Sequence, residues 1–261
     1  MKKIKCVIMD WAGTAVDYGC FAPVAAFIEA FAEKGLIIDV VQTRKPMGLP
    51  KIQHIRELLS MPEVNEQFAT RYQRAWTGED VVELNRLFEK HLFASLENYT
   101  DPIPGVIPTL EKLRAEGLKI GSTTGYTREM MNVVLPAAQA KGYRVDYCAT
   151  PNLLPAGRPA PYMIFENLIK LGVDSLDAVV KVGDTIADIK EGVNAKVCSV
   201  GVVLGSNEMA LTEAETKAMP AAELEARIAE VKERMFAAGA SYVILSMEEL
   251  PALIERMNAD R

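Results

Sequence analysis

Short apolar runs rich in β-branched residues alternate along this chain with segments of helical periodicity. The apolar runs lie at residues 4–10, 118–124, 145–150, 178–184, 196–203 and 241–245. They are almost continuously apolar, and such runs are typical of strands that are covered on both faces. Helical patterns lie between them, at residues 105–116, 127–141, 159–171 and 186–194. We therefore predict an α/β fold with a Rossmann-like, mostly parallel sheet.

Residues 19–102 interrupt this alternation. Helical patterns lie there near residues 22–34, 51–59, 64–76 and 79–97, and no run has the pattern of a strand. An all-helical block inside an α/β chain indicates an inserted domain. Its edges are expected at Tyr18-Gly19 and at the Pro-rich segment 100–108, because Gly and Pro interrupt regular elements. We predict a core formed by residues 1–18 and 103–261, and a helical cap domain formed by residues 19–102.

Composition excludes several classes of protein. The 261 residues carry a net charge of -6, which argues against nucleic acid as the main partner. No stretch reaches the roughly 18 apolar residues of a membrane span, and the apolar N-terminal run is too short for a signal peptide. The four cysteines form no Cys-x-x-Cys pair, so we expect reduced thiols and a cytoplasmic location. Near the C-terminus we expect a helix or helix pair at 208–238 and a final helix capped by Ser246 and Glu249.

Polar residues follow three of the predicted strands. Asp10 follows the first, Thr124 and Gly125 follow the second, and Asp184 follows the fourth, with Asp188 one helical turn later. Ligands of open α/β sheets bind at the carboxyl ends of the strands. These residues, distant in sequence, are therefore expected to surround one site.

A strand-end aspartate such as Asp10 can accept a phosphoryl group as a nucleophile or bind Mg²⁺, although a turn or cap role is also open. Asp184 and Asp188 could hold a hard cation opposite Asp10, whereas capping explains only one of them readily. Thr124 and the amides around Gly125 resemble a phosphate cradle or an ordinary turn. Arg158 could neutralise both a phosphate and Asp10, or be a solvated charge.

Lys51 opens a predicted helix directly after the turn Met47-Gly48-Leu49-Pro50, and His54 follows on the same helical face. A lysine at a helix N-terminus opposes the helix dipole, although a solvated charge is the usual explanation. Desolvation and neighbouring cations would favour its neutral amine, which can condense with an aldehyde to form a Schiff base. His54 could move protons during that step.

The segments Asp10-x-Ala12-Gly13-Thr14, Thr124, Arg158 and Gly183-Asp184-Thr185 resemble, in this order, the four motifs of the haloacid dehalogenase superfamily. The resemblance covers the whole chain, and it implies that the helical insert is a cap domain. Two departures stand out. Ala12 replaces the aspartate that protonates leaving oxygens in most phosphatases of the superfamily, and Arg158 replaces the usual lysine.

Further blocks, including "DYGCFAP", "RKPMGLPKIQHIR" and "GSTTGYTREMM", resemble the phosphonoacetaldehyde hydrolases of this superfamily. The resemblance implies Mg²⁺-dependent cleavage of the P–C bond of phosphonoacetaldehyde in 2-aminoethylphosphonate degradation, by a homodimer. Asp10 would be the nucleophile and Lys51 the Schiff-base lysine. The metal ligands would be Asp10, Asp184 and the carbonyl of Ala12. The substrate and its phosphate group would be bound by Thr124, Gly125, Arg158 and Asp188, and the cleft would be lined by Cys20, Met47, His54 and Tyr126.

Two alternatives remain open. A phosphatase or phosphomutase acting on a small phosphate ester would use Lys51 only to bind phosphate, and the missing acid at Ala12 counts against it. A non-catalytic binding or regulatory protein would be expected to lose Asp10, Asp184 or Arg158, and this chain has all three.

Overall fold

The computed structural model describes residues 3–47, 49 and 51–260, without the side chain of Leu153. The chain divides into two compact units. A core unit comprises Met1–Cys20 and Thr100–Arg261, and a cap unit comprises Phe21–Tyr99. Gly19 belongs with the core because its amide donates to the carbonyl of Gly205 at 2.7 Å. Gly48 and Pro50 of the turn before Lys51 lie outside the described residues.

The core unit is built on a six-stranded parallel sheet with the order β3-β2-β1-β4-β5-β6. All six predicted strands are present, and the predicted α/β fold is confirmed. The strands are β1 (Cys6–Met9), β2 (Lys119–Thr123), β3 (Tyr147–Ala149), β4 (Val179–Gly183), β5 (Cys198–Val202) and β6 (Tyr242–Ile244). β1 and β4 are buried along their whole length, as expected for central strands covered on both faces.

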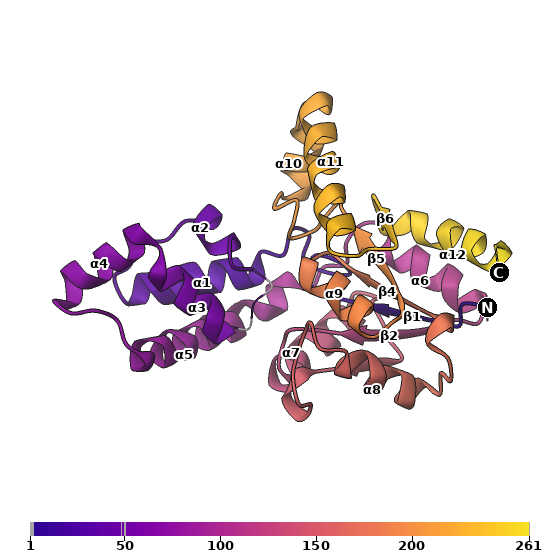
Figure 1. Ribbon diagram of the computed structural model, residues 1–261, viewed down its shortest axis with the longest axis horizontal. Coiled ribbons are helices and arrows are strands. Elements are labelled where there is room, and N and C mark those ends of the chain that lie inside the picture. Colours follow the sequence, from indigo (N-terminus) through magenta and orange to yellow (C-terminus); the bar gives the residue numbers. More distant parts are fainter. Residues whose placement is uncertain (1–2, 48, 50, 261) are drawn as a thin grey trace. The chain divides into compact units, whose positions relative to one another are not determined.

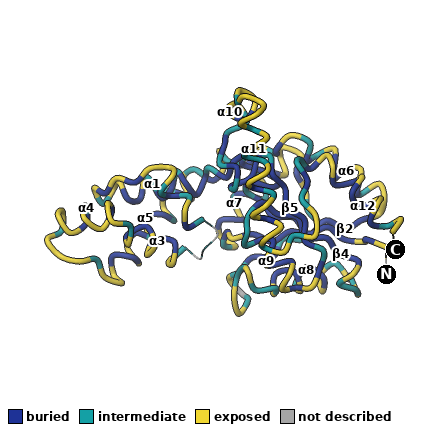
Figure 2. The backbone as a smooth tube through the Cα atoms, turned by 45° about the horizontal axis from the view of Figure 1, so that its top comes forward, coloured by how far each residue is buried: buried dark blue, intermediate teal, exposed yellow. Residues whose placement is uncertain are grey.

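Helices cover both faces of this sheet. Figure 1 shows α6 and α12 on one side of the core and α8 and α9 on the other, and Figure 2 shows the strands as the buried interior between them. This follows from right-handed crossovers, which change face where the strand order reverses. The core helices are α6 (Val106–Ala115), α7 (Arg128–Ala140), α8 (Tyr162–Leu171), α9 (Ile186–Asn194), α10 (Glu213–Ala218), α11 (Ala221–Ala237) and α12 (Leu250–Ala259), with the short 3₁₀ turns η2 (Pro151–Leu153), η3 (Leu176–Ala178) and η4 (Met247–Glu249).

One predicted cap differs in detail. η4 separates Ser246 from α12, and the Ser246 side chain makes no capping hydrogen bond. Glu249 accepts instead from the amide of Leu245. In a capping box the Glu249 carboxylate would accept from the amide of Ser246; here its donor is the amide one residue earlier.

The described part of the cap unit is entirely helical. Its elements are α1 (Ala22–Glu33), α2 (Val40–Arg44), α3 (Lys51–Ser60), α4 (Pro62–Tyr72), α5 (Gly78–Ser95) and η1 (Leu96–Tyr99). α1 packs on α5, and α3 packs on α4 and α5. Phe27, Phe31, Phe68 and Phe88 are completely buried between these helices. The cap therefore has an apolar core of its own. Among the described residues, no helix of either unit is long and apolar enough to cross a membrane.

Candidate active site

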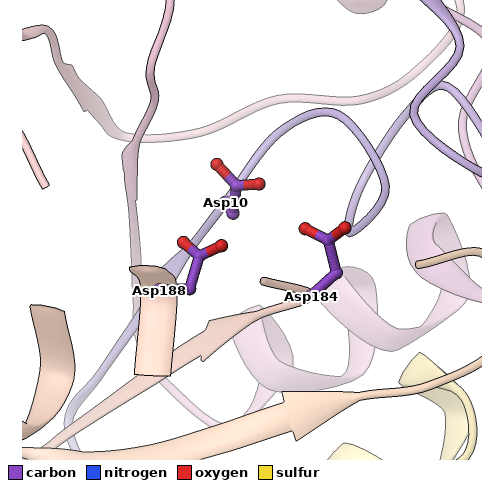
Figure 3. Close-up of side chains that lie close together, drawn as sticks. All are labelled: Asp10, Asp184 and Asp188. Atoms are coloured by element: carbon purple, nitrogen blue, oxygen red, sulfur yellow. The ribbon is translucent and has the colours of Figure 1, made fainter. Parts of the chain in front are cut away.

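Three aspartates converge at the carboxyl edge of the core sheet. Asp10 directly follows β1, Asp184 directly follows β4, and Asp188 lies in the first turn of α9. One carboxylate oxygen of each lies within 4.8 Å of the other two, and Figure 3 shows the three side chains grouped around a common space. β1 and β4 are paired in register, so Asp10 and Asp184 meet because their strands end side by side.

A second buried layer surrounds Asp184. The Thr14 hydroxyl donates to Asp184 Oδ1 at 3.0 Å, and the Asn207 amide donates to Oδ2 at 2.7 Å. Burial, together with the charges of Asp10 and Asp188, raises the pKa of Asp184 well above its usual range. The Asp184 carboxylate thus accepts neutral donors while it faces two other carboxylates, an arrangement that a bound cation would stabilise.

Arg158 lies between Asp10 and α9. Its Nη2 pairs with Asp10 Oδ1 and donates to the carbonyl of Thr123 at 2.7 Å. Burial opposes the guanidinium charge, but Asp10, Asp188 and Glu191 outweigh it and raise the pKa of Arg158. The alternative that Arg158 is a solvated surface charge, which the sequence left open, is wrong, since only 11% of this side chain is exposed.

Asp188 is engaged through both of its oxygens. Oδ1 contacts Arg158 Nη1 at 2.9 Å and Lys181 Nζ at 2.7 Å. Oδ2 accepts from the Thr185 hydroxyl at 2.6 Å and completes the capping box of α9. Burial alone would raise the pKa of Asp188, but Arg158 and Lys181 outweigh it and lower the pKa. Both oxygens of Asp188 are therefore engaged by protein groups, and the phosphate contact expected from the sequence stays a prediction for this residue.

Thr124 and Gly125 follow β2, whose pairing with β1 places Thr123 beside Asp10. The Thr124 hydroxyl accepts from the Tyr126 amide at 3.0 Å, which shapes the turn. Gly125 is exposed, whereas Tyr126 is buried. α7 begins after its N-cap Thr127, so a helix N-terminus follows this turn, as predicted. Cys20, with φ of 54°, is the buried last residue of the first core segment.

The predicted residues Lys51, His54 and Met47 belong to the cap unit. Lys51 is the first residue of α3, and its Nζ lies 5.5 Å from the ring centre of Phe27 and 5.4 Å from that of Phe88. His54 is completely buried and stacks on Phe27 at 4.0 Å. Burial and the charge of Lys51 lower the pKa of His54 to about 3. Met47 is half-buried before α3.

Sequence reasoning missed Lys181, Glu191 and Thr14. Lys181 interrupts the apolar run of β4, and a lysine in a strand covered on both faces was a usable signal. Glu191 lies one helical turn after Asp188 and therefore on the same face of α9. Thr14 belongs to the quoted first motif, but its partner Asp184 lies far along the chain.

The charges of the core cluster suit a divalent metal. The cluster contains four carboxylates and two cations, so with every group ionised two negative charges are left over. The carboxylates are Asp10, Asp184, Asp188 and Glu191, and the cations are Arg158 and Lys181. The oxygen donors are those preferred by hard cations such as Mg²⁺. The residues present thus fit a magnesium ion.

Comparison with known proteins gives one consistent family. Residues 4–196 match the family model of haloacid dehalogenase-like hydrolases. The chain is 85% identical over 259 residues to the phosphonoacetaldehyde hydrolase of Bacteroides fragilis, covering 99% of this chain and 98% of the relative. It is 50% identical to a bifunctional phosphonoacetaldehyde hydrolase/aminoethylphosphonate transaminase of Clostridioides difficile, covering 97% of this chain and 40% of that protein. A crystal structure of a phosphonoacetaldehyde hydrolase like protein from Oleispira antarctica superimposes with a TM-score of 0.93 at 33% identity, covering 99% of this chain and 94% of that chain.

Proposed function

This chain belongs to the phosphonoacetaldehyde hydrolases of the haloacid dehalogenase superfamily, and from that premise we propose that it cleaves the P–C bond of phosphonoacetaldehyde to give acetaldehyde and phosphate. The observation that carries the proposal is the environment of Asp10. This carboxylate is buried against Arg158 and lies beside Asp184, while the position two residues later is Ala12. The site therefore has a nucleophile and charge stabilisation, but at position 12 it has no acid to protonate a leaving oxygen.

Asp10, Asp184 and the carbonyl of Ala12 are the residues that would hold Mg²⁺. When bound, the ion neutralises charge on the transferring phosphoryl oxygens. Thr14 and the Asn207 amide hold the Asp184 carboxylate in place for this role. Arg158 adds a fixed positive charge beside Asp10.

Lys51 supplies the route for the carbon leaving group. Its neutral amine attacks the aldehyde carbon, one proton is taken up from solvent, water leaves, and a protonated imine remains. Asp10 then attacks phosphorus, and the electrons of the P–C bond move into the imine to give an enamine and an aspartyl phosphate. The enamine takes up a proton at carbon, and hydrolysis of the imine releases acetaldehyde and free Lys51. Water finally cleaves the aspartyl phosphate to give inorganic phosphate.

The surroundings of Lys51 support this role. The Lys51 amine lies over the faces of Phe27 and Phe88, so apolar ring surface adjoins the nitrogen that would form the imine. The same ring faces attract the positive charge of the protonated imine. We assign His54 to packing beside this lysine, because an imidazole with a pKa of about 3 is neutral and only weakly basic near pH 7.

We assign substrate contacts to the other predicted residues. Thr124 and the amides around Gly125 bind the phosphonyl oxygens together with Arg158, and Asp188 anchors Arg158. The substrate contacts expected of Cys20, Met47 and Tyr126 stay predictions. We further infer a cytoplasmic homodimer that acts in 2-aminoethylphosphonate degradation. The Clostridioides difficile relative supports that pathway, because its name combines this hydrolase with an aminoethylphosphonate transaminase.

Borohydride trapping tests the proposal. The protein is incubated with phosphonoacetaldehyde and borohydride, and the reduced adduct is located by peptide mass. We expect the adduct on Lys51, and we expect Lys51→Arg to form none, because a guanidinium stays protonated. The Lys51→Arg variant should keep its fold yet produce no acetaldehyde. An unmodified Lys51 in a protein that hydrolyses simple phosphate esters would instead favour a phosphatase or phosphomutase.

A further inference from the structure

A closed ring of ion pairs links Arg158 to the interior of the core. Asp188 Oδ1 lies 2.9 Å from Arg158 Nη1 and 2.7 Å from Lys181 Nζ. Glu191 Oε2 lies 3.2 Å from Arg158 Nε and 3.5 Å from Lys181 Nζ. Each carboxylate therefore bridges the same two cations. Lys181 is a second positive charge that acts on Arg158 through shared partners.

The inner part of this ring is closed to water. The side chains of Lys181, Asp188 and Glu191 are 0% exposed. Ionised groups at such depth cost several kcal/mol each unless they are well paired. Glu191 accepts from the Thr123 hydroxyl at 2.9 Å, but its Oε1 has no hydrogen-bond partner among the described residues. Together with Asp10 the network pairs three carboxylates with two cations, so it is short of positive charge rather than rich in it.

The charge around Arg158 shows why a second cation is needed. Asp10, Asp188 and Glu191 all contact this one guanidinium. Three carboxylates around a single cation give this region a net negative charge, which would repel a phosphonate or phosphate. Lys181 contacts two of those carboxylates and offsets part of their charge. Arg158 then keeps positive potential for an incoming anion.

We propose that Lys181 is a positioning residue for oxyanion binding, which neutralises Asp188 and Glu191 from the interior and so leaves the charge of Arg158 available to the phosphoryl group. Lys181 acts through Arg158 and does not touch the substrate, because it is completely buried. The inference rests on the proposed function for the identity of the anion. It assigns a role to a residue outside the sequence motifs.

Two substitutions should shift anion binding in opposite directions. Lys181→Met keeps an unbranched apolar stem but removes a positive charge, so it should weaken phosphate binding. Glu191→Gln keeps an oxygen for Arg158 Nε but removes a negative charge, so it should strengthen phosphate binding. Each change should be about tenfold, the effect of one charge across ~10 Å of protein at an effective dielectric constant near ~20. The double variant should lie close to the wild type.

Isothermal titration of the full chain with inorganic phosphate at saturating Mg²⁺ measures this directly. Lys190→Met is the matched control, because it removes one positive charge from an exposed position on α9, the helix that carries Asp188 and Glu191. The control should bind phosphate like the wild type. Circular dichroism and thermal unfolding establish that each variant is folded.

Opposite shifts for the two single variants support the proposal, because a purely structural network would lose affinity in both. Unchanged binding by a folded Lys181→Met, weaker or unchanged binding by Glu191→Gln, or no phosphate binding by the wild type would overturn it. If Lys181→Met fails to fold, Glu191→Gln alone decides. A wild type that binds phosphate but does not cleave phosphonoacetaldehyde would contradict the proposed function and leave this inference standing.

Discussion

At the residue scale, His54 is a buried imidazole whose protonation opposes folding. It is completely buried against Phe27, and burial together with the charge of Lys51 lowers its pKa from 6.5 to about 3. Below pH 6.5 the unfolded chain gains a proton at this position that the folded chain does not bind. The stability contributed by neutral His54 is therefore present above pH 6.5 and is lost as the pH falls toward 3.

We predict that His54→Phe keeps the ring stack and reduces this acid sensitivity. Between about pH 7 and about pH 5.5 the variant should lose about 1 kcal/mol less unfolding free energy than the wild type. Urea unfolding, followed by the fluorescence of Trp76 in a Trp11→Phe background, reports on the cap. His91, which pairs with Glu33 at 2.7 Å and is partly exposed, provides the control. Equal acid sensitivity in His54→Phe and His91→Gln would contradict the assignment.

Some residues of the site could be predicted from the sequence, and others could not. Asp10, Thr124 and Asp184 were predictable because each follows an apolar run, and parallel strands end at one edge of the sheet. Lys181 and Glu191 belong to the same network, yet their partners lie on other elements, and only the fold shows that Arg158 and Lys181 share the carboxylates of Asp188 and Glu191. The spacing of Asp188 from Asp184 likewise does not reveal that Asp188 pairs with Lys181.

At the element scale, the turn that follows β1 determines the position of Asp184. Gly13 has φ of +87°, and a Cβ at this residue would lie 2.2 Å from Asp184 Oδ2. Any side chain there must displace the proposed metal ligand. Gly117, in the turn before β2, has a similar φ of +82° with no atom within 4 Å of its Cβ position. An alanine at Gly117 would therefore suffer only backbone strain, whereas an alanine at Gly13 would suffer the same strain and also clash with Asp184.

We predict that Gly13→Ala weakens Mg²⁺ binding by about tenfold or more, the usual effect of disturbing a ligand's support. Gly117→Ala should lose only about 1 kcal/mol of stability through its positive φ and should bind Mg²⁺ normally. Calorimetric titration with Mg²⁺ and thermal unfolding distinguish these effects. Normal Mg²⁺ affinity in a folded Gly13→Ala protein would argue against Asp184 as a ligand.

Among the elements, the six strands and the long helices were predictable because burial imposes a period on their sequences. α2 was not, since it has only five residues and Val40 and Val41 are exposed. Its start is set by a local capping box, in which Asp39 accepts from the Gln42 amide at 2.7 Å. A helix of this length is too short for its apolar residues to show a helical period, so the sequence pattern does not predict it.

At the scale of the whole molecule, the proposed catalytic groups are divided between two units with separate apolar cores. Asp10 and Arg158 belong to the core unit, whereas Lys51 belongs to the cap unit. The cap is inserted where two core segments already meet. The Asp17 amide donates to the Asp101 carbonyl at 3.2 Å, and Val16 pairs with Pro102. The core should therefore close without the insert.

We predict that replacing Phe21–Tyr99 with a Gly/Ser linker of about four residues leaves a folded core. This core keeps the Asp10 cluster, so it should still bind phosphate in the presence of Mg²⁺. It lacks Lys51, the proposed Schiff-base residue, so hydrolysis of phosphonoacetaldehyde should fall by about 10⁴-fold or more. Phosphate titration and acetaldehyde release measure the two functions separately. Substantial acetaldehyde release by the core alone would show that Lys51 is dispensable. A core that stays unfolded would instead show that the two units depend on one another for folding.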